Sequence, residues 1–356
     1  MSTKYHKLKV KQVVRETPDT ISIYFKQPFF SKIRYKPGQF LTLLVPINGQ
    51  VERRSYSMSS CPHTEDELCV TVKRVANGKV SNYLNDHLKP GQELEVMEPM
   101  GNFHLDLHPV QRHVVLIGAG SGITPLMSIA KAVLRMESTS IVSLLYGNRS
   151  EDSIIFKEIL DKLQKQFSGR FQVLHILSRP SHTWTGYRGR LSQSLATKLL
   201  NELPKLNVHK MDYYLCGPQG MMEEMQATLL AMQVPAEKIH KESFVTAQAT
   251  ATTKPETEAV SNSVVKTEEV TLRYDGSVYK IKVSPNKTIL EAGLDSGLDL
   301  PYSCQSGLCT ACRGKCLSGK VKMDEEDGLS PQEIKEGFVL PCVSHPLTSD
   351  VVIEIG

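Results

Sequence analysis

Four cysteines in the C-terminal part of the sequence have spacings that could support redox chemistry. They follow the pattern C-x4-C-x2-C with a distant fourth member, and they are Cys304, Cys309, Cys312 and Cys342. This spacing is typical of a plant-type [2Fe-2S] cluster, which is held by four thiolates and carries one electron. Structural zinc sites usually combine two short Cys or His pairs, so the spacing favours a cluster over zinc or an inert set of thiols. Cys316 is interpreted as a small buried thiol rather than a competing ligand.

A one-electron centre needs an electron source, and two upstream segments could face a dinucleotide. Residues 118–125, with the sequence GAGSGITP, follow an apolar run typical of a buried strand. Their backbone N–H groups could bind a diphosphate at a helix start, although Ile123 breaks the G-x-G-x-x-G fingerprint. Cys216, followed by Gly217 and Pro218, ends a second expected parallel strand and would face the same crevice. Each segment taken alone could be a plain turn.

A flat ring and a phosphate could bind earlier in the chain. In the segment RRSYS, Arg54 and Tyr56 share one face of an expected strand. The guanidinium can pair with a phosphate there, and the phenol ring can stack. Residues 78–81, with the sequence GKVS, are expected to start a helix with Ser81 as its cap. Without further context both segments could be ordinary surface.

The pattern of strands and turns predicts a multidomain protein. Residues 1–108 hold short strands separated by Pro-Gly and Asn-Gly turns, which indicates an antiparallel β-barrel. Residues 110–245 alternate strands with helices, one expected at 128–136, which indicates an α/β domain with a parallel sheet. Residues 246–267 are rich in Ala, Thr, Ser and Glu and predict a flexible linker. Residues 268–356 predict a compact α+β domain.

The composition argues against several classes of partner. The 42 basic and 38 acidic residues give a net charge of only +4, without a basic tract, so no nucleic acid partner is expected. We find neither a signal peptide pattern nor an apolar run long enough to span a membrane. Eight cysteines, half of them in a metal pattern, fit a cytoplasmic protein better than a disulfide framework.

Taken in order, the segments RRSYS, GKVS, GAGSGITP and CGP resemble the ferredoxin-NADP reductase superfamily, and residues 268–356 resemble a plant-type ferredoxin of β-grasp fold. The order of flavin, nucleotide and cluster domains is that of the reductase components of multicomponent oxygenases. The likeness is greatest to the reductase subunits of phenylacetyl-CoA epoxidases, followed by reductases for desaturases and steroid hydroxylases. The resemblance implies an NAD(P)H-dependent oxidoreductase that takes a hydride onto FAD and passes single electrons through the [2Fe-2S] cluster to an oxygenase.

The resemblance also implies roles for individual residues. Arg54 would hold the FAD diphosphate, Tyr56 would pack on the flavin, and Ser57 would hydrogen-bond near the flavin N5. Phe244 stands where the family places an aromatic ring over the flavin, with core packing as the alternative. Cys216 would lie near the nicotinamide. The remaining implied contacts are Gly78, Val80 and Ser81 for FAD, and Gly118, Gly120, Gly122, Thr124, Gly217 and Pro218 for the nucleotide.

The choice between NADPH and NADH depends on the residues near the adenosine ribose. The resemblance places Ser178 and Arg179 there, with Arg188 nearby, and no Asp or Glu stands at 178–182. An arginine accommodates a 2′-phosphate, whereas NAD enzymes tend to have an acidic residue at the ribose. The sequence therefore favours NADPH, the alternative being that Arg179 is a solvated charge at the end of a strand.

Two questions stay open at this stage. The acceptor could be a desaturase, a steroid hydroxylase or a Rieske oxygenase instead of an epoxidase, and a non-catalytic protein for redox sensing or assembly is the alternative of another class. The acidic run 324–327 could steer a basic partner toward the cluster or be a solvated loop.

Overall fold

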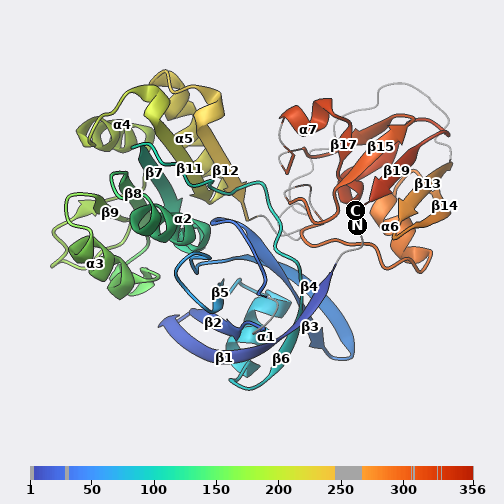
Figure 1. Ribbon diagram of the computed structural model, residues 1–356, viewed down its shortest axis with the longest axis horizontal. Helices are drawn as coiled ribbons and strands as arrows, with labels where there is room; N and C mark the ends of the chain where they lie inside the picture. Colours follow the sequence, from blue (N-terminus) through green and yellow to red (C-terminus); the bar gives the residue numbers. More distant parts are fainter. Residues whose placement is uncertain are drawn as a thin grey trace.

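The computed structural model describes residues 4–28, 32–244, 267–305, 307, 309–326, 328–329 and 331–355. Three sheets form the cores of three parts (Figure 1), with the first part at the bottom of the view, the second at upper left and the third at upper right. The predicted linker 246–267 lies outside the described residues except for Thr267. No helix in the described part of the chain is long and apolar enough to cross a membrane.

The first part is a curled antiparallel sheet with the strand order β4-β3-β6-β1-β2-β5. A bridge between Met58 and Val70 joins its two edges at one end, which gives the sheet its barrel character. The tight turn between β3 and β4 uses Asn48 and Gly49, both with positive φ, as short hairpins prefer. The elements are β1 (Tyr5–Thr17), β2 (Thr20–Lys26), β3 (Phe40–Ile47), β4 (Gln50–Ser57), β5 (Leu68–Lys73), α1 (Lys79–His87) and β6 (Glu93–Met97).

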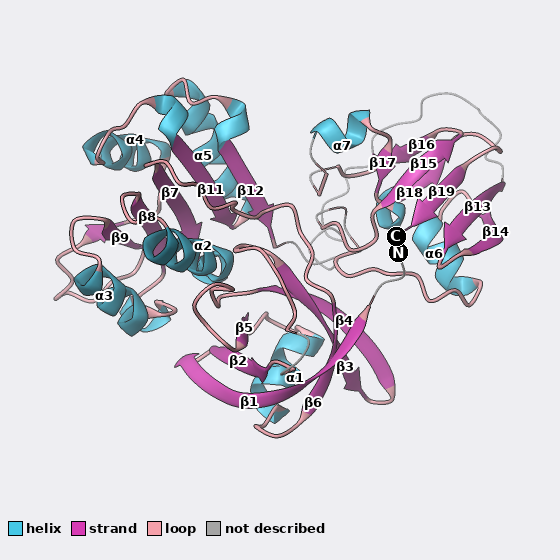
Figure 2. Cartoon of the chain, viewed as in Figure 1, coloured by secondary structure: helices cyan, strands magenta, loops and turns pink. Residues whose placement is uncertain are grey.

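The second part is a parallel sheet with the order β10-β9-β8-β7-β11-β12, covered by helices on both faces (Figure 2). Apolar residues of α2 and α3 pack on one face, and those of α4 and α5 on the other. The strands are β7 (His113–Ala119), β8 (Ile141–Asn148), β9 (Phe171–Leu177), β10 (Tyr187–Arg188), β11 (Met211–Gly217) and β12 (Ile239–Ser243). The helices are α2 (Ile123–Met136), α3 (Lys157–Gln166), α4 (Gln193–Glu202) and α5 (Gln219–Ala231).

Helix α2 begins earlier than the predicted start at residue 128. Its first turn contains Pro125, which has no N–H group to satisfy and whose fixed φ suits a helix start. The whole of α2 down to Leu134 is buried, so the helix packs tightly against the sheet from the glycine-rich segment onward.

The third part is a mixed sheet with the order β14-β13-β19-β15-β17, beside the short pair β16-β18. Its hairpin turns at Asp275 and Gly276, both with positive φ, and a capping box of Thr288 and Glu291 starts α6, as their side chains exchange hydrogen bonds with each other's backbone N–H. The elements are β13 (Glu268–Tyr274), β14 (Ser277–Val283), α6 (Ile289–Asp295), β15 (Gly314–Ser318), β16 (Val321–Met323), α7 (Pro331–Lys335), β17 (Phe338–Val339), β18 (Ser344–Pro346) and β19 (Val352–Ile355).

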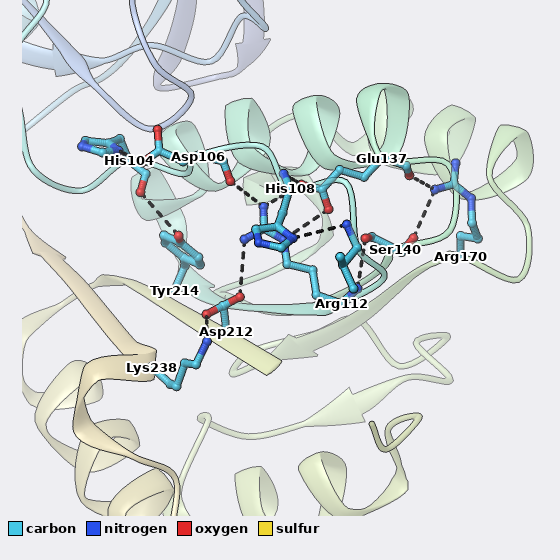
Figure 3. A network of polar contacts seen from close by, with 11 residues as sticks. His104, Asp106, His108, Arg112, Glu137, Ser140, Arg170, Asp212, Tyr214 and Lys238 are labelled. Carbon is cyan, nitrogen blue, oxygen red and sulfur yellow. Dashed lines mark hydrogen bonds and ion pairs between the residues drawn. The ribbon is translucent and has the colours of Figure 1, made fainter. Parts of the chain in front are cut away.

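A buried arginine fixes the segment that connects the first two parts (Figure 3). The Arg112 guanidinium donates through Nη2 to Glu137 Oε1 at 2.6 Å and to the backbone oxygen of Asp106 at 2.7 Å. It also pairs with Asp212 at 3.4 Å, whose other oxygen accepts from Lys238 at 3.0 Å. Because the Glu137 side chain is only 3% exposed, its charge depends on this partner.

We expect Arg112→Ala to lower the free energy of unfolding by about 3–5 kcal/mol, because it leaves the Glu137 carboxylate buried without its cation. Urea or thermal unfolding measures the loss. Lys157→Ala is the control, since it removes an exposed pair with Asp161 and should change stability by less than about 0.5 kcal/mol. An equally small effect of Arg112→Ala would contradict the role assigned to the network.

Candidate active site

The glycine-rich segment packs directly against the end of β11. Gly118 belongs to β7, Gly120 and Gly122 form a 3-10 turn, and Thr124 lies in the first turn of α2. A Cβ atom on Gly122 would stand 2.0 Å from the backbone oxygen of Cys216, so only glycine fits there. Gly120 has a φ of 54°, in the left-handed region. The structure therefore brings together the two segments in which sequence analysis placed the nucleotide.

Cys216 is a buried, neutral thiol at the centre of the parallel sheet's carboxyl edge. It pairs in register with Gly118 of β7 on one side and with Glu242 of β12 on the other. Burial raises the pKa of the Cys216 thiol well above its ordinary value, and the nearby Glu242 raises it further. A thiol in this state is not a nucleophile. Cys216 can therefore contribute shape and a soft, apolar surface to a bound ring. Gly217 follows it as the last residue of β11, and Pro218 is the N-cap of α5.

Glu242 is a site residue that sequence analysis missed. Its Oε2 accepts a hydrogen bond from Ser57 Oγ at 3.3 Å, which joins the end of β4 in the first part to β12 in the second. Burial raises the pKa of Glu242 to about 8, so the carboxyl group is mainly protonated at pH 7. Part of the residue still reaches solvent, but its carboxyl group is surrounded by protein atoms. The pairing depends on tertiary contacts, and only the position of Glu242 just before Phe244 hinted at it.

The flavin residues predicted from the sequence lie along β4 and at the start of α1. Arg54 keeps a 45% exposed side chain, and Tyr56 packs against the barrel core. Glu52 forms ion pairs with Arg54 at 3.8 Å and with Lys79 at 2.6 Å, so β4 and the first residue of α1 are neighbours. A guanidinium, an aromatic ring and a helix start thus meet in one region, which fits the diphosphate and flat ring of FAD.

The start of α1 differs in one respect from the prediction. The N-cap is Gly78, and no side chain caps the helix. The prediction that Ser81 caps α1 is wrong, because Ser81 Oγ accepts from the backbone N–H of Val75 instead, at 3.1 Å. Val80 is buried in the barrel core, so only its backbone could meet a diphosphate. Within the described part of the chain, the first N–H groups of α1 therefore have no capping side chain, as an anion site at a helix start requires.

Phe244 follows β12 directly and is 42% exposed. The alternative that Phe244 packs in a core is therefore wrong. Its position two residues after Glu242 brings it next to the Ser57 contact, where an aromatic ring could cover a flavin.

The region predicted to bind the adenosine ribose contains both arginines and an acidic side chain. Ser178 and Arg179 are exposed after β9, and their backbone N–H groups donate to the oxygens of Asn148 and Arg149. Arg188 Nη2 donates to the backbone oxygens of Ser181, His182 and Trp184, so it shapes this loop. Glu151, from the loop after β8, accepts from Ser181 Oγ at 2.5 Å. No local pattern indicated this carboxylate, because it comes from another segment of the chain.

The four predicted cluster ligands contact one another. A hydrogen bond with the Cys304 thiol raises the pKa of Cys309, and hydrogen bonds with Cys304 and Cys312 raise the pKa of Cys342. Cys312 and Cys342 are buried, and Cys304 and Cys309 are partly exposed. These contacts link the four thiols in one chain, as the ligand set of a [2Fe-2S] cluster requires, although no group of three or more such side chains among the described residues is already arranged to hold a metal ion.

Cys316 lies apart from these four thiols, on β15. Its Sγ donates to the backbone oxygen of Ser318 at 3.2 Å. Cys316 packs against the core of the third part but stays partly exposed, so the prediction of a buried thiol is wrong in that respect.

The fold and these sites define a ferredoxin reductase-type oxidoreductase. Three family descriptions match in the order found along the chain: the oxidoreductase FAD-binding domain at residues 7–105, the oxidoreductase NAD-binding domain at 116–227, and the 2Fe-2S iron-sulfur cluster binding domain at 272–347. The last of these matches resolves the choice between zinc and a cluster in favour of the cluster.

Full-length relatives show which group of ferredoxin reductase-type oxidoreductases this chain resembles. The chain is 36% identical to the E component of 1,2-phenylacetyl-CoA epoxidase from Escherichia coli, over 99% of this chain and 98% of the relative. It is also 36% identical to the ferredoxin reductase component of 3-ketosteroid-9-alpha-monooxygenase from Rhodococcus rhodochrous, over 98% and 96%. The solved structure of phthalate dioxygenase reductase has the same fold, with a TM-score of 0.60, 24% identity and 98% coverage of both chains. The chain belongs to the family of ferredoxin reductase-type oxidoreductases that serve as electron-transfer components of oxygenase systems.

Cys342→Ser should abolish the visible absorbance and iron content of the cluster, because it removes one of four thiolates. Cys316→Ser is the matched control and should keep both, since the Cys316 thiol points to a backbone oxygen away from the four. Iron analysis and the visible spectrum of each purified variant measure its cluster content. Full cluster content in Cys342→Ser, or its loss in Cys316→Ser, would show that the ligand set is wrong.

Glu242 should make the protein less stable as the pH rises. Between the ordinary carboxyl pKa of 4.5 and the folded pKa of about 8, the folded protein keeps a proton that the unfolded chain has lost. Stability therefore falls with rising pH across this window. Glu242→Gln removes this dependence. The melting temperature of the variant minus that of the wild type should therefore increase from pH 5 to pH 9. The exposed substitution Glu158→Gln is the control, and melting curves of Glu242→Gln that stay parallel to the wild type would contradict the assignment.

Proposed function

We propose that this protein is an NADPH-dependent reductase that takes a hydride onto FAD and passes single electrons through its [2Fe-2S] cluster to an oxygenase of the phenylacetyl-CoA epoxidase type. The observation that carries the proposal is the hydrogen bond between Ser57 and Glu242. This bond joins β4, the proposed flavin strand, to β12, which pairs with the strand that ends in Cys216 and Gly217. The proposed domains are an FAD-binding barrel at 1–108, a nucleotide domain at 110–245, a linker at 246–267 and a ferredoxin domain at 268–356.

Each group of residues has a task in this proposal. Arg54 and the free N–H groups of α1 bind the FAD diphosphate, with Gly78, Val80 and Ser81 around it, while Tyr56 and Phe244 flank the ring. When bound, FAD accepts a hydride as two electrons and releases them one at a time, and the cluster carries one electron. Gly120, Gly122 and Thr124 orient the nucleotide.

The charge state of the site supports hydride transfer. The neutral Cys216 thiol and the protonated Glu242 place no full charge beside the two rings. Protonated Glu242 still accepts a hydrogen bond from Ser57 Oγ through Oε2, at 3.3 Å. No further acid or base is required, because the redox chemistry belongs to the cofactors.

The class of oxygenase that accepts the electrons is proposed from the sequence comparisons. The epoxidase relative is 36% identical to this chain, the steroid monooxygenase relatives are 36–37% identical, and the glycine betaine monooxygenase reductases reach 31%. The epoxidase relative is matched over 98% of its length, which supports this acceptor class first. The match to the oxidoreductase NAD-binding domain at residues 116–227 argues against a sensor that binds no nucleotide.

Anaerobic titration of the iron-loaded protein with NADPH, and separately with NADH, tests the function. We expect flavin and cluster absorbance to bleach together at low NADPH. No bleaching with either nucleotide would overturn the enzyme assignment. Turnover with purified epoxidase, steroid monooxygenase and Rieske oxygenase components then ranks the acceptors, and the fastest should be the epoxidase.

Arg179→Ala should raise the KM for NADPH by about tenfold, because it removes a charge-assisted bond to the 2′-phosphate worth about 1.4 kcal/mol or more. The KM for NADH should stay unchanged. Arg188→Ala is the matched comparison: it loosens the loop that its carbonyl contacts hold, so it should raise both KM values together. Equal effects of Arg179→Ala on both nucleotides would contradict the NADPH assignment, and the nearby Glu151 would then be the candidate for a ribose contact.

A further inference from the structure

One arginine of the barrel makes three contacts with the ferredoxin domain. Arg53 Nη2 donates to Asp299 Oδ1 at 2.5 Å, and Nη1 donates to the backbone oxygen of Leu300 at 3.0 Å. The guanidinium also lies 4.7 Å from the centre of the Tyr302 ring, within cation-π range. The Arg53 side chain is only 10% exposed. A planar, forked cation with this many partners fixes the orientation of the segment it holds.

The segment that Arg53 holds leads directly into the cluster ligands. Ser303, the residue before Cys304, forms a hydrogen bond of 2.6 Å with Ser55 of β4. Ser55 also bonds to Thr42 of β3 at 2.9 Å, so the hydroxyl is oriented from within the barrel. Ser55 directly precedes Tyr56, and Ser303 directly precedes Cys304. The hydrogen bond between the two serines therefore connects a proposed flavin residue to a predicted cluster ligand through one peptide link on each side.

The alternation of side chains along β4 explains why these contacts do not compete with the flavin. Residues 54 and 56 lie on one face of the strand, and residues 53 and 55 lie on the other. Arg54 and Tyr56, two of the proposed flavin contacts, therefore lie on the opposite face of the strand from the ferredoxin contacts, whereas Ser57, at the end of the strand, shares the face of Arg53 and Ser55. Figures 1 and 2 show β4 on the side of the barrel that faces the third part.

A second contact between the described residues of the two domains is polar and lies beside an open cavity. Asn102 Nδ2 donates to Glu333 Oε2 at 2.7 Å, and Glu333 also pairs with Arg313 of its own domain. A cavity of about 560 Å³ is lined from both domains, including Asn102 on one side and Thr310 on the other. A contact of this kind, polar and incompletely packed, is expected to be weak and sensitive to salt.

We propose that Arg53 is a positioning residue that docks the ferredoxin domain on β4 and thereby sets the rate of electron transfer from flavin to cluster. The inference rests on the proposed function. In each transfer one electron passes from the reduced flavin to the oxidised cluster, and no covalent bond forms or breaks. A hydride from the nucleotide supplies two such transfers. Arg53 takes no part in hydride entry, since its contacts described above go to Asp299, Leu300 and Tyr302 of the ferredoxin domain.

The test is rapid anaerobic mixing of the FAD- and iron-loaded protein with NADPH, following flavin and cluster absorbance separately. In Arg53→Ala, flavin reduction should keep its rate, and cluster reduction should slow at least tenfold. Salt should slow the cluster step in the wild type and have little further effect in the variant. Arg34→Ala is the matched control, because Arg34 lines the same cavity without a bond to residues 299–303 in the described part of the chain.

Two further measurements separate docking from a general structural effect. Arg53→Asp should slow the cluster step, and adding Asp299→Arg should restore part of the rate by reversing the ion pair. Small-angle scattering should show a larger radius of gyration for Arg53→Ala than for the wild type at low salt, whether or not NADPH reduces the protein. This readout keeps the docking testable if the proposed nucleotide chemistry fails.

Three results would overturn the inference. The first is an unchanged cluster step in Arg53→Ala. The second is equal slowing of the flavin and cluster steps, which would show that Arg53 does not act between them. The third is loss of bound FAD from Arg53→Ala and Arg53→Lys alike, which would place Arg53 in the flavin site.

Discussion

The two-residue period of β4 is the constraint on which the arrangement of sites depends. Within five residues the strand presents Arg53 and Ser55 to the ferredoxin domain, Arg54 and Tyr56 to the proposed flavin region, and Ser57, its last residue, to Glu242 of the nucleotide domain. A helix of the same length would spread these side chains around its circumference and lengthen the path between them. A strand keeps the two faces within one backbone thickness, which suits electron transfer from one side to the other.

The same constraint makes the relative placement of the domains important. A shift of β4 against the parallel sheet would separate Ser57 from Glu242, so the connecting segment must be rigid. Arg112 provides that rigidity, because its partners come from the connector, from the end of α2 and from β11. The two buried groups at the proposed nucleotide site, Cys216 and Glu242, are both mainly neutral at pH 7. The site thus avoids the cost of a buried, unpaired charge before any cofactor binds.

The features that sequence analysis predicted are those with a local physical cause. The cluster spacing, the glycine turn at Gly122 and the hairpin at Asp275 each follow from a few neighbouring residues. The wrong or missing predictions concern side chains that have more than one possible hydrogen-bond partner, and contacts between segments far apart in the sequence. Ser81 could cap a helix, but the N–H of Val75 takes its oxygen. Glu151 and Glu242 reach their sites from other loops and strands, which no local pattern records. Alternation placed Arg53 opposite Arg54, yet nothing in the sequence indicated that a third domain covers that face.

A weak contact around Arg53 suits a ferredoxin domain that must leave the flavin domain in order to deliver electrons to an external acceptor. A cluster locked against the flavin could receive electrons but could not approach an external acceptor. The composition of residues 246–267 predicts a flexible coil spanning about 25 Å, and a short flexible tether keeps its ends at an effective concentration of the order of millimolar. A docking free energy of only about −4 kcal/mol, equivalent to a Kd of about 1 mM, then suffices to populate the docked state about half the time. An arginine with two hydrogen bonds and a ring contact can supply stabilisation of that order. A much larger, apolar interface would hold the ferredoxin domain against the barrel and prevent it from delivering electrons to the acceptor.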